Sequence, residues 1–121
     1  MAKFENIYDL EERTACFSER LVDFCKECPK TVTISTLIEQ GLRAGTSVGA
    51  NYCEANGASS KKDFKNKVFI CKKEGKETMY WLRLLGRALD EGKPKEDCRR
   101  LWQEAKELTL IFSKIAASTK G

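Results

Sequence analysis

The sequence predicts an all-α protein, an antiparallel up-down-up-down four-helix bundle. Apolar residues recur at helical spacing in four segments, and both prolines, Pro29 and Pro94, fall between these segments. The connections between the segments are short, which favours antiparallel neighbours. A chain of 121 residues is long enough for one hydrophobic core and too short for two, so we expect a single domain over residues 1–121.

The first two helices are expected over residues 9–28 and 34–56. Asp9 followed by Glu12 resembles a capping box at the start of the first helix. The second helix begins between Thr33 and Thr36 and ends at a turn signal, Asn56-Gly57. The apolar residues expected to face the core are Leu10, Phe17, Leu21, Phe24 and Cys28 in the first helix, and Leu37, Ile38, Leu42, Val48 and Tyr52 in the second.

The last two helices are expected over residues 60–91 and 94–118. Ser60 with Asp63 predicts an N-terminal cap for the third helix, and Gly92 with the following proline ends it. The residues expected in the core are Phe64, Cys71, Leu82 and Leu85 in the third helix, and Cys98, Leu101, Ala105, Leu108, Phe112 and Ile115 in the fourth.

Three glycines, Gly41, Gly45 and Gly49, recur every four residues in the second helix. Each glycine inside a helix costs about 1 kcal/mol relative to alanine, so this series needs a reason. We interpret it as a ridge of small residues that lets another helix approach closely. The alternative is a ligand bound against the bare backbone.

A polar stripe lies beside this ridge, and we expect it to bridge the second and third helices. Its members are Arg43, Ser47, Asn51, Glu54, Lys67 and Glu74. If the helices fold back about a turn at residues 57–60, residue numbers that sum to roughly 117 face each other. The expected pairs are Arg43 with Glu74, Ser47 with Ile70 or Cys71, Asn51 with Asn66 or Lys67, and Glu54 with Asp63 or Lys62.

The polar stripe is expected to set helix register and specificity. The functional alternative is an acid/base site on Glu54 and Glu74. The chain has no histidine, no glycine-rich phosphate loop and no plausible pair of nucleophile and base, so we expect no enzyme activity, no catalytic residues and no cofactor.

Six cysteines are present, of which Cys25 and Cys28 form a CxxC motif. No second pair and no histidine complete a zinc site, and a redox motif would require a βαβ context. We therefore expect free thiols that act as small hydrophobic residues, and no metal. No apolar run approaches the roughly 20 residues that span a bilayer, and Met1 to Tyr8 lack a signal-peptide core, so we expect a cytoplasmic protein without a membrane partner.

Several of these segments carry a family resemblance. They are Leu10–Thr14 (LEERT), Arg43–Ala55 (RAGTSVGANYCEA), Ser60–Phe64 (SKKDF), Lys73–Thr78 (KEGKET) and Trp81-Leu82. Over about residues 7 to 119 the chain is similar to the four-helix-bundle family of 23S rRNA intervening-sequence proteins. Gly75 departs from the pattern, which has alanine there.

This resemblance implies an antiparallel four-helix bundle that commonly forms a ring-shaped homopentamer. Members are bacterial and are encoded within insertions in large-subunit rRNA genes or elsewhere in the genome. A related branch comprises accessory proteins of diversity-generating retroelements, which bind a reverse transcriptase and nucleic acid. The family has no assigned catalytic residues, so none is carried over to this chain.

The charge of the chain is concentrated in the third helix. Residues 60–88 hold nine basic and three acidic residues, whereas residues 1–59 hold six basic and nine acidic ones. At about 100° per residue, six cations fall within an arc of roughly 80° that points away from the core face. This basic stripe comprises Lys61, Lys65, Lys72, Lys76, Arg83 and Arg87.

A row of one sign over several turns suits contacts to phosphates, without any sign of base readout. We therefore expect an oligomer that binds RNA or other nucleic acid regardless of sequence. The alternatives are a solvated face and a protein-interaction module, such as a reverse-transcriptase accessory subunit or a structural ring.

The third helix also carries more large apolar residues than one core requires. Phe69, Met79, Tyr80 and Leu84 lie outside the arc of core residues, and Trp81 lies at its edge. Large apolar residues on a contiguous surface usually mark an interface, so the pattern predicts a homo-oligomer. The alternative is that helix curvature buries these side chains under the termini.

Overall fold

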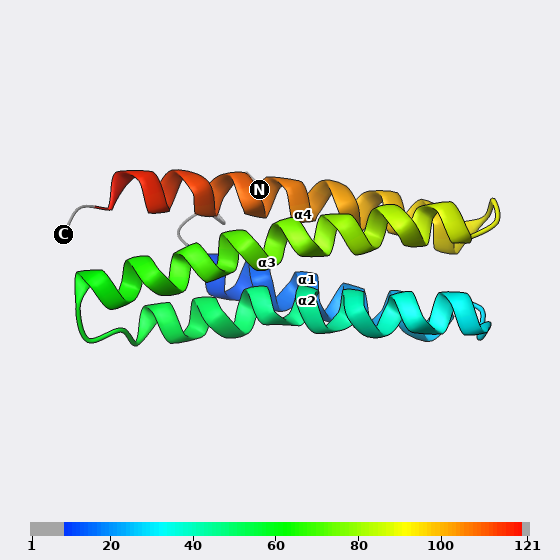
Figure 1. Cartoon of the computed structure of the whole chain (residues 1–121), viewed down its shortest axis with the longest axis horizontal. Coiled ribbons are helices and arrows are strands. Elements are labelled where there is room, and N and C mark those ends of the chain that lie inside the picture. The colour runs from blue at the N-terminus through cyan, green and yellow to red at the C-terminus, as the bar shows by residue number, and fades with distance from the viewer. Residues whose placement is uncertain (1–8, 120–121) are drawn as a thin grey trace.

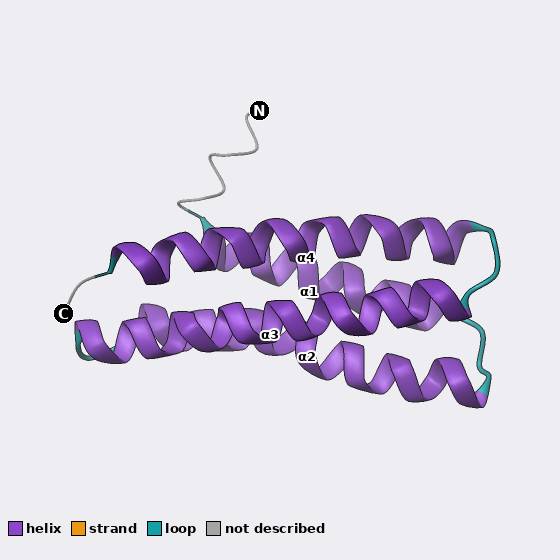
Figure 2. Ribbon diagram, turned by 45° about the horizontal axis from the view of Figure 1, so that its top comes forward, coloured by secondary structure: helices purple, strands orange, loops and turns teal. Residues whose placement is uncertain are grey.

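Residues 9–119 are described by a computed structural model, in which they form four helices and no strand. The helices are α1 (Leu10–Glu27), α2 (Val32–Asn56), α3 (Lys61–Ala88) and α4 (Lys93–Ser118). Consecutive helices run in opposite directions, and α4 returns to lie beside α1 (Figure 1). Figure 2 shows the four helices with only short loops between them. The predicted all-α antiparallel four-helix bundle is therefore confirmed.

The two middle helices, α2 and α3, are each capped at the N-terminus by a hydroxyl side chain. The Ser60 Oγ accepts a hydrogen bond from the Asp63 N–H at 3.0 Å, as predicted. The Thr31 Oγ1 accepts one from the Ile34 N–H at 3.1 Å, so α2 begins at Val32, two residues before the expected start. Both capping residues have extended backbone conformations, which let the side chain reach back to the first turn.

The capping box predicted at Asp9 is wrong. Asp9 precedes α1, but its side chain makes no capping hydrogen bond to the described residues. Its backbone, with φ −124° and ψ 49°, lacks the extended conformation that an N-cap side chain needs. At the turn between α3 and α4, α3 ends at Ala88 rather than at residue 91, because the backbone becomes extended at Leu89. Gly92, with a φ of +145°, then leads into α4 one residue earlier than expected.

The core lies along the predicted apolar faces, which are confirmed for α1 and for most of α4. In α2, Val48 is buried, while the other expected residues are partly buried against the core, as are Phe64 and Ile115. Two buried threonines, Thr14 and Thr109, satisfy their hydroxyls by donating to the carbonyl four residues earlier in their own helix, at 2.8 and 2.7 Å. No helix among residues 9–119 has the length and apolar character to cross a membrane.

The glycine ridge of α2 packs against neighbouring helices, as predicted. A Cβ added to Gly45 would overlap the Leu21 side chain of α1, and one added to Gly49 would lie 3.4 Å from Thr14. Gly41 faces α3, where its Cβ would lie 3.5 Å from the Trp81 Cβ. The missing side chains let α1 and α3 approach the α2 backbone.

Gly75 has the same role between α3 and α4. It is buried, and a Cβ at this position would overlap the Thr109 Oγ1. The alanine expected from the family pattern therefore does not fit beside Thr109 without a shift.

All six cysteines are free thiols. Cys28, Cys71 and Cys98 are buried, and burial raises the pKa of Cys71 and of Cys98 to about 12. Cys16 and Cys53 are exposed, so the expectation of small hydrophobic residues is wrong for these two.

Candidate nucleic-acid interface

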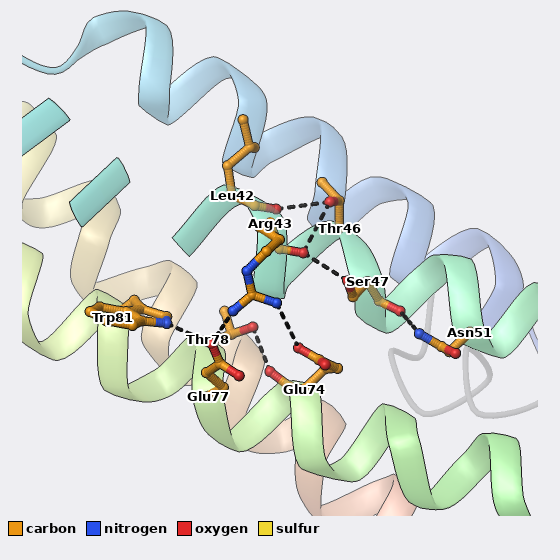
Figure 3. A network of polar contacts seen from close by, with 9 residues as sticks. All are labelled: Leu42, Arg43, Thr46, Ser47, Asn51, Glu74, Glu77, Thr78 and Trp81. Carbon is orange, nitrogen blue, oxygen red and sulfur yellow. Dashed lines mark hydrogen bonds and ion pairs between the residues drawn. The ribbon is translucent and has the colours of Figure 1, made fainter. Parts of the chain in front are cut away.

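The best-developed part of the polar stripe is the group around Arg43 (Figure 3). Its Nη1 lies 3.6 Å from the Glu74 Oε1, which confirms the predicted ion pair between α2 and α3. The same guanidinium also pairs with Glu77, and the Glu77 carboxylate accepts a hydrogen bond from the Trp81 Nε1 at 2.9 Å. The pKa of Glu77 is held below its ordinary value, first by this indole hydrogen bond and then by the positive charge of Arg43.

Glu74 is less well satisfied than Glu77. Its side chain is only 15% exposed, and within the described residues its Oε1 has no hydrogen-bond partner. The 3.6 Å separation from Arg43 is too long for a hydrogen bond, so the two charges attract without a direct bond. The expected role of this pair in setting the register between α2 and α3 stays a prediction.

The other members of the polar stripe bond differently from the prediction. Ser47 and Asn51 each donate to a carbonyl of their own helix four residues earlier, at 2.8 Å, and not across to α3. Glu54 pairs with Lys67 at 2.7 Å, where residue 62 or 63 was expected. The predicted partner of Glu54 is therefore wrong, while the positions expected to face Ser47 and Asn51 stay a prediction.

The mismatch has one geometric cause. Two of the observed pairs between α2 and α3, Lys67 with Glu54 and Arg43 with Glu77, have residue numbers that sum to more than the expected value, whereas Arg43 with Glu74 matches it. Side chains lean toward the N-terminus of their own helix, and in an antiparallel pair both leans favour partners of higher residue number. The turn predicted at residues 57–60 is correct, but the side chains meet several residues further along.

A second ion-pair group, not found from the sequence, joins α1 to α4. Arg13 donates to both Glu104 oxygens, at 2.8 and 3.0 Å, and to Glu107 at 2.9 Å. The Arg13 side chain is only 12% exposed, and its bonds to Glu104 raise the pKa of the guanidinium. Only a known rotation of α1 against α4 would reveal this pairing, because Arg13 and Glu104 are 91 residues apart in sequence.

The basic stripe runs along one side of α3 and borders the buried face of that helix at Val68. Lys61, Lys76, Arg83 and Arg87 are exposed, and Lys65 and Lys72 are partly buried. Within residues 9–119 none of the six takes part in an ion pair. By contrast, Lys67 on the same helix faces α2 and is neutralised by Glu54.

The apolar residues predicted to lie outside the core divide into two groups. Phe69 and Tyr80 are 56% and 55% exposed. Met79 packs against the core, which contradicts its predicted exposure, while Leu84 and Trp81 are partly buried. The rings of Tyr80 and Trp81 meet edge to face with their centroids 5.1 Å apart.

These features define an antiparallel four-helix bundle whose third helix presents a row of cations that form no ion pair within residues 9–119. Residues 8–114 match the family described as 23S rRNA-intervening sequence protein, and the chain belongs to this family.

A solved relative supports the assignment. The chain is similar to a protein of unknown function from the S23 ribosomal protein family of Bacteroides thetaiotaomicron, whose crystal structure superposes with a TM-score of 0.76 at 33% sequence identity. The similarity covers 89% of this chain and 98% of that one. No match is found among curated proteins.

Proposed function

We propose that this protein is a non-enzymatic homo-oligomer that binds nucleic acid, RNA above all, through the basic stripe of α3. The observation that carries the proposal is the division of the α3 cations. Lys67, which faces α2, is paired with a glutamate, whereas the outward stripe has no ion pair among the described residues. Unpaired lysine and arginine side chains suit phosphate contacts, which gain affinity by releasing counterions.

Self-association is supported by a separate part of α3. Tyr80 is exposed beside the partly buried Trp81 and Leu84, and Trp81 lies next to α2 at Gly41. Trp81 places part of this apolar area on the α2 side of the helix, whereas Tyr80 lies one turn from Lys76 and Arg83, so an interface there would border the basic stripe. The family resemblance implies five subunits, and a ring would repeat the stripe around the assembly.

The test is a charge reversal of two stripe residues, Lys72→Glu with Lys76→Glu. We expect weaker binding to RNA and DNA of any sequence. For single strands, the logarithmic salt dependence should flatten by about 0.7 for each phosphate that the protein no longer neutralises.

The matched control reverses Lys26 and Lys114, two exposed lysines of α1 and α4. It makes the same change in net charge away from the stripe. Equal loss of affinity in both double variants would mean that only net charge matters. Unchanged affinity in the Lys72/Lys76 variant at low salt would favour a protein partner, such as a reverse transcriptase.

A further inference from the structure

Phe69 is a large aromatic side chain on the outer surface of α3, beside the basic stripe. It is 56% exposed, which is unusual for phenylalanine, and it is absent from the apolar residues packed against the core. The Lys72 ammonium lies 5.5 Å from the centroid of its ring. The ring is therefore exposed to solvent with the Lys72 ammonium over one of its faces, which leaves the other face for a stacked base.

A shallow groove of about 620 Å³ surrounds this ring. Every residue that lines it belongs to α3: Asn66, Phe69, Ile70, Lys72, Lys73 and Lys76. None of its three lysines forms an ion pair with a described residue. The groove therefore combines an apolar floor with a rim of three free positive charges.

The apolar floor and the three lysines of the groove indicate which kind of partner it can bind. Protein–protein interfaces are depleted in lysine, so a protein partner would need several acidic side chains placed against these three ammonium groups. A nucleic-acid duplex offers phosphates but keeps its base faces stacked inside. A single strand offers both phosphates and free base faces, and bases stack readily on aromatic side chains.

We infer that the Phe69 groove binds single-stranded nucleic acid, with one base stacked on the Phe69 ring and the neighbouring phosphates contacted by Lys72, Lys73 and Lys76. This inference rests on the nucleic-acid binding proposed above. Phe69 and Lys76 are two helical turns apart, about 10 Å along the axis, so a few nucleotides span the groove. Stacking on a phenyl ring favours no particular base, in agreement with binding regardless of sequence.

The test separates the bases from the phosphates. A dT20 strand and an abasic 20-mer with the same number of phosphates are titrated at low salt against the wild-type protein, Phe69→Leu and Phe69→Trp. We expect the wild type to bind dT20 at least about fivefold more tightly than the abasic strand. Phe69→Leu should bind both strands with the affinity that the wild type has for the abasic strand. Phe69→Trp should keep the preference for dT20.

Three results would overturn the inference. The wild type binds both strands equally, Phe69→Leu weakens binding to both strands alike, or Phe69→Leu changes only the assembly mass in light scattering, which would make the groove a contact with a second copy. In the first two cases the phosphate-binding proposal stands. If the wild type binds neither strand, the proposed function itself fails.

Discussion

Arg43 of α2 lies 3.6 Å from Glu74 of α3 while it also pairs with Glu77, so one half-exposed guanidinium serves two carboxylates. Arg43→Met should destabilise the protein by about 1–2 kcal/mol, because it leaves the mostly buried Glu74 carboxylate without its nearest positive charge. Urea denaturation measures this loss. In Arg43→Met combined with Glu74→Gln the loss should be smaller than the sum of the two single effects. Strict additivity would show that the two residues are not coupled.

Glu77 should make stability depend on acid pH. Its pKa in the folded protein lies below the ordinary 4.5, first because Trp81 donates to the carboxylate and then because Arg43 is near. A carboxyl group with a lowered folded pKa stabilises the fold above its unfolded pKa and loses that effect as pH falls through the folded value.

We therefore expect Glu77→Gln to be less stable than the wild type at neutral pH, with the difference shrinking below about pH 4.5. Denaturation midpoints over this range measure it, and Trp81→Phe should reproduce part of the effect. A difference that stays constant with pH would contradict the assignment.

Gly75→Ala should lower stability even though alanine is the better helix former. The propensity gain is about 1 kcal/mol, while forcing a methyl group against Thr109 costs about 1–3 kcal/mol. Adding Thr109→Ala should recover much of the loss. The matched control is Gly86→Ala on the same helix, where the new Cβ would lie 4.0 Å from the Cys98 sulfur and has room. That variant should be neutral or stabilised in thermal denaturation, and an equal loss at both glycines would contradict the packing argument.

The assembly proposal predicts a mass above that of one chain in light scattering at micromolar concentration. Tyr80→Lys should lower this mass, because it places a charge in the exposed apolar area beside Trp81. Leu110→Lys is the matched control, since Leu110 is 54% exposed on α4, outside that area. A monomer mass for the wild type at all concentrations would end the ring proposal.

The helices and their core faces could be predicted because the 3.6-residue period shows in each segment by itself. The cap at Ser60 could also be predicted from the sequence. The cap of α2, Thr31, could not, because the nearby Thr33, Ser35 and Thr36 have similar capping ability. Only the local backbone conformation distinguishes them, and at Asp9 that conformation defeats an otherwise suitable sequence.

Contacts between helices were harder to predict, because they depend on rotation and side-chain direction. The Arg43–Glu74 pair was found because a long arginine reaches two successive turns of α3, at Glu74 and Glu77. Glu54 pairs with Lys67 instead of the expected Asp63 or Lys62. This partner lies further along α3, in the direction that the lean of the side chains favours. The groove at Phe69 was missed as a site, because the exposed phenylalanine was interpreted only as part of an interface.

The distribution of the free thiols gives the protein two natural attachment points for spectroscopic labels. Maleimide reagents react with the thiolate, which burial suppresses at Cys71 and Cys98. Cys16 and Cys53 lie on the surface of α1 and α2, where the hydrogen bond to Glu12 raises the pKa of Cys16 and desolvation raises that of Cys53. Spin labels placed there, on α1 and α2 rather than on α3, would report distances between neighbouring chains of the proposed oligomer. The arrangement of the proposed ring would thus be measurable with the cysteines that the chain already contains.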